Sequence, residues 1–165
     1  MKIEWMGRYR EFMKALVLHS NMTARVSSLS VEIGSGISLT PYEWQVFECI
    51  LEHEEENVNM ISMSNGLGVP QSTFSKIVQK LCRCGVVERY QTSSNRKNII
   101  LKGTEKGRSL YLNHSEQVLK DTFQPLFDGL DSLSDEAVQT VAEALCRFNQ
   151  RHRDSMVELH PVAEK

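Results

Sequence analysis

The sequence predicts a mainly α-helical protein with one small β-ribbon, and three features of the chain lead to this prediction. Apolar residues recur at helical spacing near both ends of the chain, in residues 3–33 and 134–148. Two shorter helical patterns flank a break at Gly68 and Pro70, and two β-rich runs follow within residues 86–101. With 165 residues, the chain forms one domain, or one small domain with long packing arms.

Residues 3–33 are predicted to form one long amphipathic helix. At about 1.5 Å per residue, such a helix would exceed about 40 Å, which is more than a small domain needs. This length suggests packing against a partner chain, with a bundle inside a single chain as the alternative. Gly34-Ser35-Gly36 is expected to break the helix.

The next helix is predicted to begin after Thr40 and to continue to about Leu51. Thr40 is an N-cap candidate, Pro41 occupies the first helical position, and Glu43 completes a capping box. The polar residues 53–57 then connect this helix to the next, and they lack the spacing of a zinc protease motif.

Two short helices across a tight turn are predicted at the centre of the chain. The first is Met60–Leu67, followed by Gly68 in the place of a left-handed C-cap and by Pro70, through which a helix cannot continue. The second starts at Pro70 or the residue after it, ends near Cys84, and is terminated by Gly85. This is a helix-turn-helix pattern, whose second helix lies in the major groove of DNA.

A ribbon of two strands is predicted behind this motif, from residues 86–90 and 98–101, with the long polar connection 91–97 between them. A ribbon with a basic tip behind a helix-turn-helix is a winged helix. Thr104 is the N-cap candidate of the following helix, which is expected to pass Thr122 and to end or kink at Pro125. Ser134 is predicted to cap the last helix.

A basic block coincides with this motif. Residues 69–108 contain nine basic and two acidic residues and so carry a net charge of +7, whereas the whole chain carries −2 and the remainder therefore −9. A basic block inside an acidic protein is typical of a local binding surface for a polyanion. The basic residues are Lys76, Lys80, Arg83, Arg89, Arg96, Lys97, Lys102, Lys106 and Arg108.

Residues 69–107 resemble the MarR family of bacterial transcription regulators, without a gap. The resemblance implies a winged helix-turn-helix lobe between dimerisation helices, and a DNA-binding regulator that is not an enzyme. Its matching motifs are Ser72-Thr73-Phe74-Ser75-Lys76 in the recognition helix, Leu81 followed by Gly85-Val86-Val87-Glu88-Arg89, Thr104-Glu105-Lys106-Gly107, and Leu39-Thr40 before the preceding helix.

Two departures from the family pattern stand out. The wing usually carries Asp-x-Arg, and this chain has Asn95-Arg96-Lys97. Arg suits a narrow minor groove better than Lys does, so either Lys97 takes the signature position or Arg96 replaces it. The family usually has Leu where this chain has Gly103, from which we expect a looser junction between the wing and the next helix.

The recognition helix is predicted to read bases with Gln71, Ser72, Thr73, Ser75 and Lys76, since Gln can pair with adenine and Lys can reach guanine. Polar residues further along the helix and in the wing are expected to contact DNA as well, mostly at phosphates. They are Gln79, Lys80, Arg83, Arg96 and Lys97.

The expected partners are double-stranded DNA with an inverted-repeat operator and a second copy of the chain. Segments 1–36 and 108–165 are predicted to supply the dimerisation helices around the DNA-binding lobe, 37–107. The resemblance also implies a small aromatic effector and, more often than not, repression. No cofactor and no metal site are expected, because the five histidines are scattered without ligand spacing.

Two alternatives remain open at the level of the sequence. Cys82 and Cys84 lie among Lys80, Arg83 and Arg89, and nearby cations favour a reactive thiolate, so a thiol-based redox regulator is one alternative. A winged helix used only for protein contacts is the other. The sequence also shows no secretory signal and no membrane span, from which a cytoplasmic protein is expected.

Overall fold

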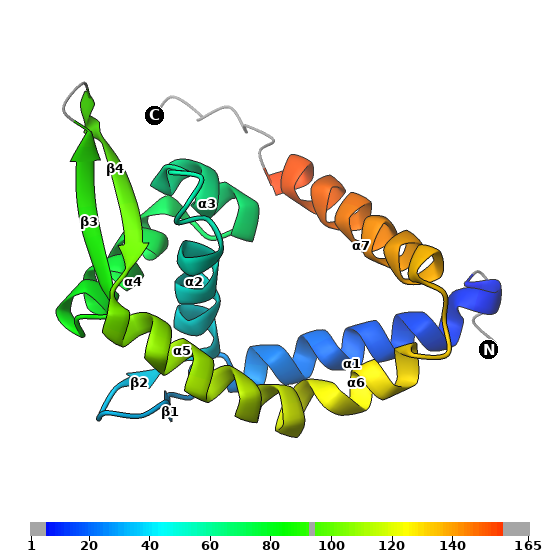
Figure 1. Ribbon diagram of the computed structural model, residues 1–165. Helices are drawn as coiled ribbons and strands as arrows, with labels where there is room; N and C mark the ends of the chain where they lie inside the picture. Colours follow the sequence, from blue (N-terminus) through cyan, green and yellow to red (C-terminus); the bar gives the residue numbers. More distant parts are fainter. Residues whose placement is uncertain (1–5, 93–94, 157–165) are drawn as a thin grey trace, which may run out of the picture. The chain divides into compact units, whose positions relative to one another are not determined.

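The computed structural model describes residues 6–92 and 95–156, and it describes side chains for residues 6–91 and 99–151. The chain forms two compact units, Met1–His114 and Ser115–Lys165 (Figure 1). The elements before the boundary are η1 (Gly7–Tyr9), α1 (Arg10–Val26), β1 (Val31–Glu32), β2 (Ser38–Leu39), α2 (Pro41–Glu52), α3 (Met60–Leu67), α4 (Gln71–Arg83), β3 (Val87–Thr92) and β4 (Asn95–Gly103). Helix α5 (Glu105–Val118) crosses the boundary, and η2 (Leu119–Phe123), α6 (Gln124–Leu130) and α7 (Asp135–Met156) follow it.

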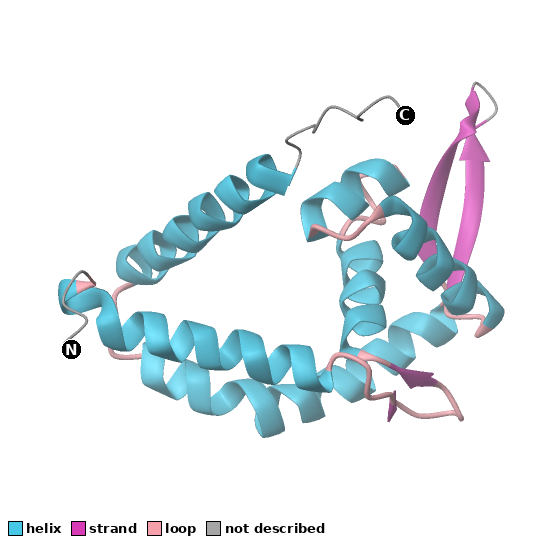
Figure 2. Ribbon diagram, turned by 180° about the vertical axis from the view of Figure 1, so that it is seen from behind, coloured by secondary structure: helices cyan, strands magenta, loops and turns pink. Residues whose placement is uncertain are grey.

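The predicted fold class is confirmed: the chain is mainly helical, and its described strands form two separate two-stranded antiparallel sheets, drawn as magenta arrows in Figure 2. None of the described helices combines the length and the apolarity that a membrane span requires.

The predicted long N-terminal helix is too long at its C-terminal end. Helix α1 ends at Val26, and the chain then forms a small hairpin in which Val31 pairs with Leu39. Gly34, Ser35 and Gly36 form its turn, all with positive φ (111°, 54° and 71°). Ile33 directly follows β1 and is buried, and its N–H donates to the carbonyl of Ile37 at 2.8 Å. The helical spacing of the apolar residues concealed this hairpin from the sequence prediction. Residues 3–5 of the predicted helix lie outside the described residues.

Helices α2, α3 and α4 agree with the predicted caps. Thr40 and Glu43 form the predicted capping box, in which Glu43 N donates to Thr40 Oγ1 at 3.2 Å and Thr40 N donates to Glu43 Oε2 at 2.9 Å. Gly68 ends α3 with a left-handed φ of 67°, and Gly85 follows α4 with a φ of 71°. These caps place the turn of the helix-turn-helix where the sequence predicts it.

The ribbon β3–β4 is longer than predicted. Its register runs from Val87 opposite Gly103 to Gln91 opposite Ile99, and after a bulge Thr92 pairs with Asn95. Most of the predicted connection 91–97 is therefore strand, because paired strands satisfy backbone groups that a loop would expose to water. Positions 93–94 lie outside the described residues.

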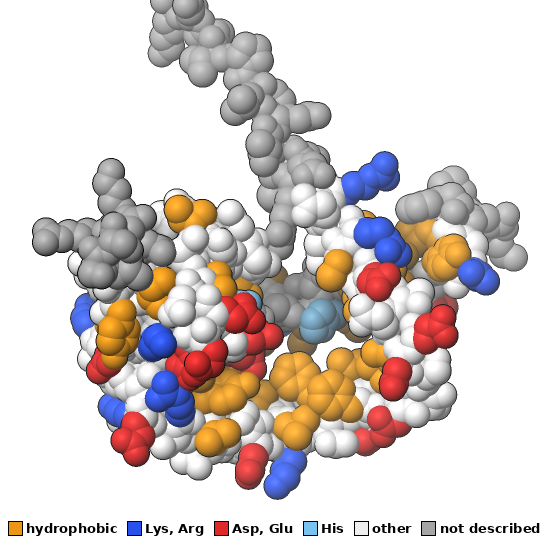
Figure 3. Space-filling view, turned by 45° about the horizontal axis from the view of Figure 1, so that its top comes forward, with side chains coloured by type: hydrophobic (Ala, Val, Ile, Leu, Met, Phe, Trp, Pro, Cys, Tyr) orange, Lys and Arg blue, Asp and Glu red, His pale blue; other side chains and the backbone are white. Residues whose placement is uncertain are grey.

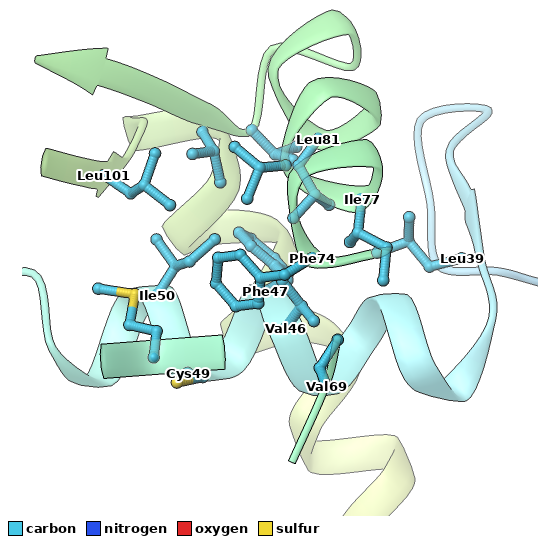
Figure 4. Close-up of a cluster of buried hydrophobic side chains, with 14 of the residues drawn as sticks. Leu39, Val46, Phe47, Cys49, Ile50, Val69, Phe74, Ile77, Leu81 and Leu101 are labelled. Atoms are coloured by element: carbon cyan, nitrogen blue, oxygen red, sulfur yellow. The ribbon is translucent and has the colours of Figure 1, made fainter. Parts of the chain in front are cut away.

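The core of the winged helix-turn-helix lobe lies where α2, α4 and the ribbon meet (Figure 4). Phe47 and Ile50 of α2, Phe74 and Leu81 of α4, and Leu101 of β4 are almost completely buried. Burying a side chain of this size contributes roughly 1.5–3 kcal/mol to the free energy of unfolding, so this cluster holds both α4 and the β3–β4 wing against α2.

The helices after the lobe follow the predicted signals. Gly107 N donates to Thr104 Oγ1 at 2.9 Å, and Ala137 N donates to Ser134 Oγ at 3.2 Å, so both predicted N-caps are present. The backbone widens into a π-helical turn, η2, that ends at Phe123, two residues before Pro125. Proline has no N–H for the preceding turn, and a π-turn is one way in which a helix accommodates this loss.

Candidate nucleic-acid interface

Helix α4 has one buried and one exposed face. Phe74, Ile77, Val78 and Leu81 face the core. Six of the predicted DNA-contacting residues share the exposed side, whereas Thr73 and Lys80 are half-buried at its border. The six are Gln71, Ser72, Ser75, Lys76, Gln79 and Arg83. The structure thus brings four of the five predicted base-reading residues together on a single polar strip, with Thr73 at its border.

The N-terminal end of α4 is preceded by Pro70, with φ −55° and ψ 135°, which has no side-chain acceptor to cap the first turn. The first N–H groups of a helix carry the positive end of its dipole and attract anions. This end of α4 therefore suits a phosphate, and the polar residues Gln71 and Ser72 stand beside it.

The C-terminal end of α4 is held by the start of α5. Thr104 Oγ1 donates to the carbonyl of Gly85 at 2.8 Å, and Lys106 Nζ donates to the carbonyl of Cys84 at 3.0 Å. At Gly107 a Cβ would lie 2.2 Å from the carbonyl oxygen of Val86, so only glycine fits there. The motif Thr104–Gly107 therefore holds the C-terminal end of α4 in place, a role that its sequence pattern alone does not reveal.

Lys80 has a partner within the lobe. Its Nζ lies 2.5 Å from Glu43 Oε2, the same oxygen that closes the capping box of α2. The Lys80 side chain is 32% exposed and that of Glu43 is 16% exposed. Sequence reasoning missed this pair because 37 positions separate the two residues.

Gly103 does not loosen the junction between the wing and α5, so that expectation is wrong. Gly103 is buried, and a Cβ on it would lie 2.3 Å from Leu51 Cδ2. Its N–H donates to Glu54 Oε2 at 2.9 Å, and Arg108 donates to both oxygens of the same carboxylate. The missing side chain makes room for Leu51 and Glu54, and the junction is tight as a result.

The hydrogen bonds from Arg108 hold the pKa of the Glu54 carboxyl below its usual range, with smaller support from the Gly103 N–H. Reciprocally, Glu54 raises the pKa of the Arg108 guanidinium. On the ribbon, Tyr90 Oη donates to Glu88 Oε2 at 2.6 Å, which raises the pKa of Tyr90. The base of the wing is thus held by one ion pair, Glu54–Arg108, and the ribbon itself by a hydrogen bond from the neutral Tyr90 hydroxyl to the Glu88 carboxylate.

The predicted wing contacts Arg96 and Lys97 have backbones in strand β4. Their side chains lie outside the described residues, so the choice between them for a minor groove stays a prediction.

An aromatic cluster joins α2 to α5. Trp44 stacks on Tyr111 with ring centres 5.4 Å apart, and it meets the His114 ring edge-on at 4.6 Å. Burial and then a 2.8 Å hydrogen bond from Tyr111 Oη to Glu48 raise the pKa of Tyr111 to about 12. Burial lowers the pKa of His114. This cluster holds α2 and α5 together through ring contacts and the hydrogen bond to Glu48.

The thiols differ in exposure. Cys49 is buried, and burial raises the pKa of its thiol; Cys82 and Cys84 are half-buried, and Cys146 is exposed. Among the described residues, no group of three or more His, Cys, Asp or Glu side chains is placed to hold a metal ion.

Comparison with known families and sequences points to transcription regulators. Residues 35–101, which contain the helix-turn-helix and most of the ribbon, match the family "Sugar-specific transcriptional regulator TrmB". The chain is 29% identical over 109 residues to the uncharacterized HTH-type transcriptional regulator YhjH of Bacillus subtilis, covering 65% of this chain and 61% of that protein. It is 29% identical over 100 residues to the HTH-type regulator PchR of the same organism, covering 61% and 57%. The chain thus matches less than two thirds of the length of either relative.

Solved structures share the fold across almost the whole chain. A MarR/EmrR family regulator from Acinetobacter is similar with a TM-score of 0.61 at 15% identity, covering 89% of this chain and 99% of that one. FabT of Streptococcus pneumoniae, solved with DNA, gives 0.58 at 20% identity, covering 89% and 96%. PcaV of Streptomyces coelicolor, solved with its natural ligand, gives 0.58 at 13% identity, covering 91% and 96%. The chain therefore has the winged helix-turn-helix fold of MarR-family regulators.

Proposed function

We propose that this protein is a sequence-specific DNA-binding transcription regulator that reads an inverted repeat as a homodimer. The observation that carries the proposal is the polar strip of α4, which stands opposite a fully buried face and beside an uncapped helix N-terminus. Side chains on such a strip can meet base edges in the major groove while the core side keeps the helix in place.

The electrostatics of the lobe support the same proposal. Residues 69–108 carry a net charge of +7 within a chain of −2. Lys76 and Arg83 are exposed on the polar strip, and within the described part of the chain neither has an ion-pair partner within 4.0 Å. Unpaired cations of this kind bind phosphates and release counterions, which makes affinity depend steeply on salt.

Base reading is assigned to Gln71, Ser72, Thr73, Ser75 and Lys76, and phosphate contact to Arg83 and to the wing through Arg96 or Lys97. The half-buried Thr73 lies at the edge of the strip, where its methyl group suits a thymine methyl. The FabT structure, whose fold this chain shares, contains DNA, which agrees with this use of the lobe.

The proposed homodimer rests on apolar side chains that stand exposed on the long helices. On α1 these include Leu18, Met22 and Val26, spaced four residues apart along one side, and on α7 they include Val141. Apolar side chains are visible on the surface of the molecule in Figure 3. Exposed apolar patches mark interaction sites, and a two-fold dimer would place two recognition helices about one turn of DNA apart.

We further propose that a small aromatic molecule weakens DNA binding and that the protein acts as a repressor. Support comes from the resemblance to MarR-family regulators and from PcaV, which was solved with its natural ligand. A coupling of roughly 1–3 kcal/mol between the two ligands would change the affinity for the operator about 5- to 150-fold.

The decisive experiment selects the duplexes that the protein binds from a random pool and footprints the protein on the most enriched sequence. A palindromic sequence, bound with an affinity that falls steeply with salt, supports both sequence-specific DNA binding and the homodimer. An affinity for duplex DNA that is absent, or that is indifferent to salt, would refute the proposal and favour a winged helix that binds protein instead.

A further inference from the structure

We propose that Lys80 is a positioning residue of the recognition helix and not a phosphate contact: its ion pair with Glu43 pins α4 to the start of α2. This inference rests on the proposed DNA binding. It also divides the basic block into cations that face DNA and cations that hold the lobe together.

The first argument is the environment of the pair. The Lys80 ammonium lies 2.5 Å from Glu43 Oε2, and the Glu43 side chain is only 16% exposed. A phosphate could draw Lys80 away only by leaving this carboxylate without its cation, and an ammonium shared between them would bring two anions close together. Removing one partner of a largely buried pair costs more than the pair contributes, so the exchange is unfavourable.

The second argument is that Glu43 is itself fixed. Its Oε2 also accepts the Thr40 N–H at 2.9 Å, and its own N–H donates to Thr40 Oγ1. The carboxylate therefore cannot follow Lys80 outward. An anchor point requires such a rigid partner, and the capping box of α2 supplies it.

The third argument is the contrast with the other cations of α4. Lys76 and Arg83 are exposed, whereas Lys80 is half-buried at the border of the strip. Lys106 and Arg108 of the same basic block are likewise engaged, with the carbonyl of Cys84 and the carboxylate of Glu54. The high positive charge of this segment thus overstates the number of phosphates that it can neutralise.

The consequence concerns the tilt of α4. Lys80 lies nine residues after Gln71, a distance of about 13 Å along a helix. A small rotation about the C-terminal end moves the base-reading end by several tenths of an ångström or more. Hydrogen bonds to bases are sensitive on that scale, whereas attraction to phosphates is not. The Lys80–Glu43 ion pair should therefore contribute more to the selectivity among DNA sequences than to the electrostatic attraction to DNA.

The test uses the full-length protein, the duplex selected from a random pool and a scrambled duplex of the same composition. Lys80→Gln should weaken binding to the selected duplex by about fivefold. It should weaken binding to the scrambled duplex less and leave the slope of log affinity against log salt unchanged. A phosphate contact would instead lower that slope by about 0.9, as Arg83→Gln is expected to do in parallel.

Glu43→Gln separates the two roles most sharply, because Gln retains the capping hydrogen bond to Thr40. If Lys80 positions α4, this variant weakens binding to the selected duplex. The double variant Lys80→Gln/Glu43→Gln then binds that duplex no more weakly than either single variant does. A phosphate contact predicts tighter binding, because Lys80 is released toward DNA. Glu52→Gln, which removes an exposed charge from the same helix, measures the general electrostatic effect.

The outcomes are distinguishable from those for the proposed function. If the unmodified protein binds no duplex, the proposed function fails. If it binds but Lys80→Gln lowers the salt slope, has no effect, or weakens both duplexes equally, the positioning role is overturned. Thermal unfolding of each variant confirms that the affinities belong to folded protein.

Discussion

Glu54 and Arg108 form a bidentate ion pair across 54 positions of sequence, with Nε–Oε1 and Nη2–Oε2 distances of 2.9 and 3.0 Å. The same carboxylate receives the N–H of Gly103, the last residue of the wing strand β4. One side chain between α2 and α3 thus fixes the base of the wing and the start of α5. This arrangement makes the wing part of the rigid lobe.

Glu54→Gln should lower the free energy of unfolding by about 1–3 kcal/mol at pH 7, since it weakens hydrogen bonds to a charged partner. The folded-state pKa of Glu54 lies below the unfolded value of about 4.3. Its stabilisation is therefore complete above that value and is lost as pH falls through the folded pKa. Urea unfolding between pH 3 and 7 should show a shallower acid loss in the variant; parallel curves would contradict this linkage.

Gly107→Ala should destabilise the lobe by about 3 kcal/mol, because the new Cβ would lie 2.2 Å from a backbone oxygen that cannot rotate away. Gly129→Ala is the matched control, since no atom lies within 4 Å of a Cβ built there. Alanine favours a helix over glycine by up to about 1 kcal/mol, so the control should be neutral or stabilising. Denaturant midpoints at equal protein concentration measure both changes.

Lys76→Ala should weaken binding to the selected duplex by about 1–3 kcal/mol and binding to random duplex by less. The reason is its place on the exposed strip one turn from the base-reading residues Ser72 and Thr73. Lys120→Ala, an exposed cation outside the lobe, should leave both affinities unchanged. Equal losses on the two duplexes would make Lys76 a phosphate contact.

Leu18→Glu should convert the proposed dimer into a monomer, because it places a charge among the exposed apolar side chains of α1. Ser20→Glu, an exposed position on the opposite side of the same helix, should leave the assembly intact. Sedimentation at micromolar concentration distinguishes the two masses. An unmodified protein that sediments as a monomer would rule out the dimer.

Cys49 should react with a thiol reagent much more slowly than Cys146. Cys49 is buried and burial raises the pKa of its thiol, whereas Cys146 is exposed on α7. Variants that retain one cysteine each, followed at pH 8 in native buffer and in urea, give the two rates.

Mild peroxide treatment should leave the affinity for the operator unchanged. A clear loss of affinity would instead support the alternative of a redox regulator that acts through Cys82 or Cys84.

The local signals in the sequence predicted the lobe well. Thr40, Gly68, Gly85 and Thr104 are caps, whose residue types are set by a few neighbouring backbone groups, and the structure confirms each of them. The alternation of buried and exposed residues on α4 was predictable for the same reason, because it follows from helical geometry alone.

Features that depend on residues far apart in sequence were not predictable. The pairs Glu43–Lys80 and Glu54–Arg108 join helices separated by tens of residues, so no spacing rule reveals them. The hairpin after α1 was missed because Leu29 and Ile33 fit a helical period as well as a strand period. The tightness at Gly103 depends on Leu51 and Glu54 filling the space of an absent side chain, which only packing shows.

The stacking of Trp44 on Tyr111 gives the protein an optical reporter of its own. The chain contains two tryptophans, and this one joins α2 to α5 within 5.4 Å of a second ring and 4.6 Å of an ionisable imidazole. Any event that shifts α2 against α5 changes the surroundings of the indole and hence its emission. With Trp5→Phe as the background, tryptophan fluorescence can follow movement at the support of the recognition helix without any attached label.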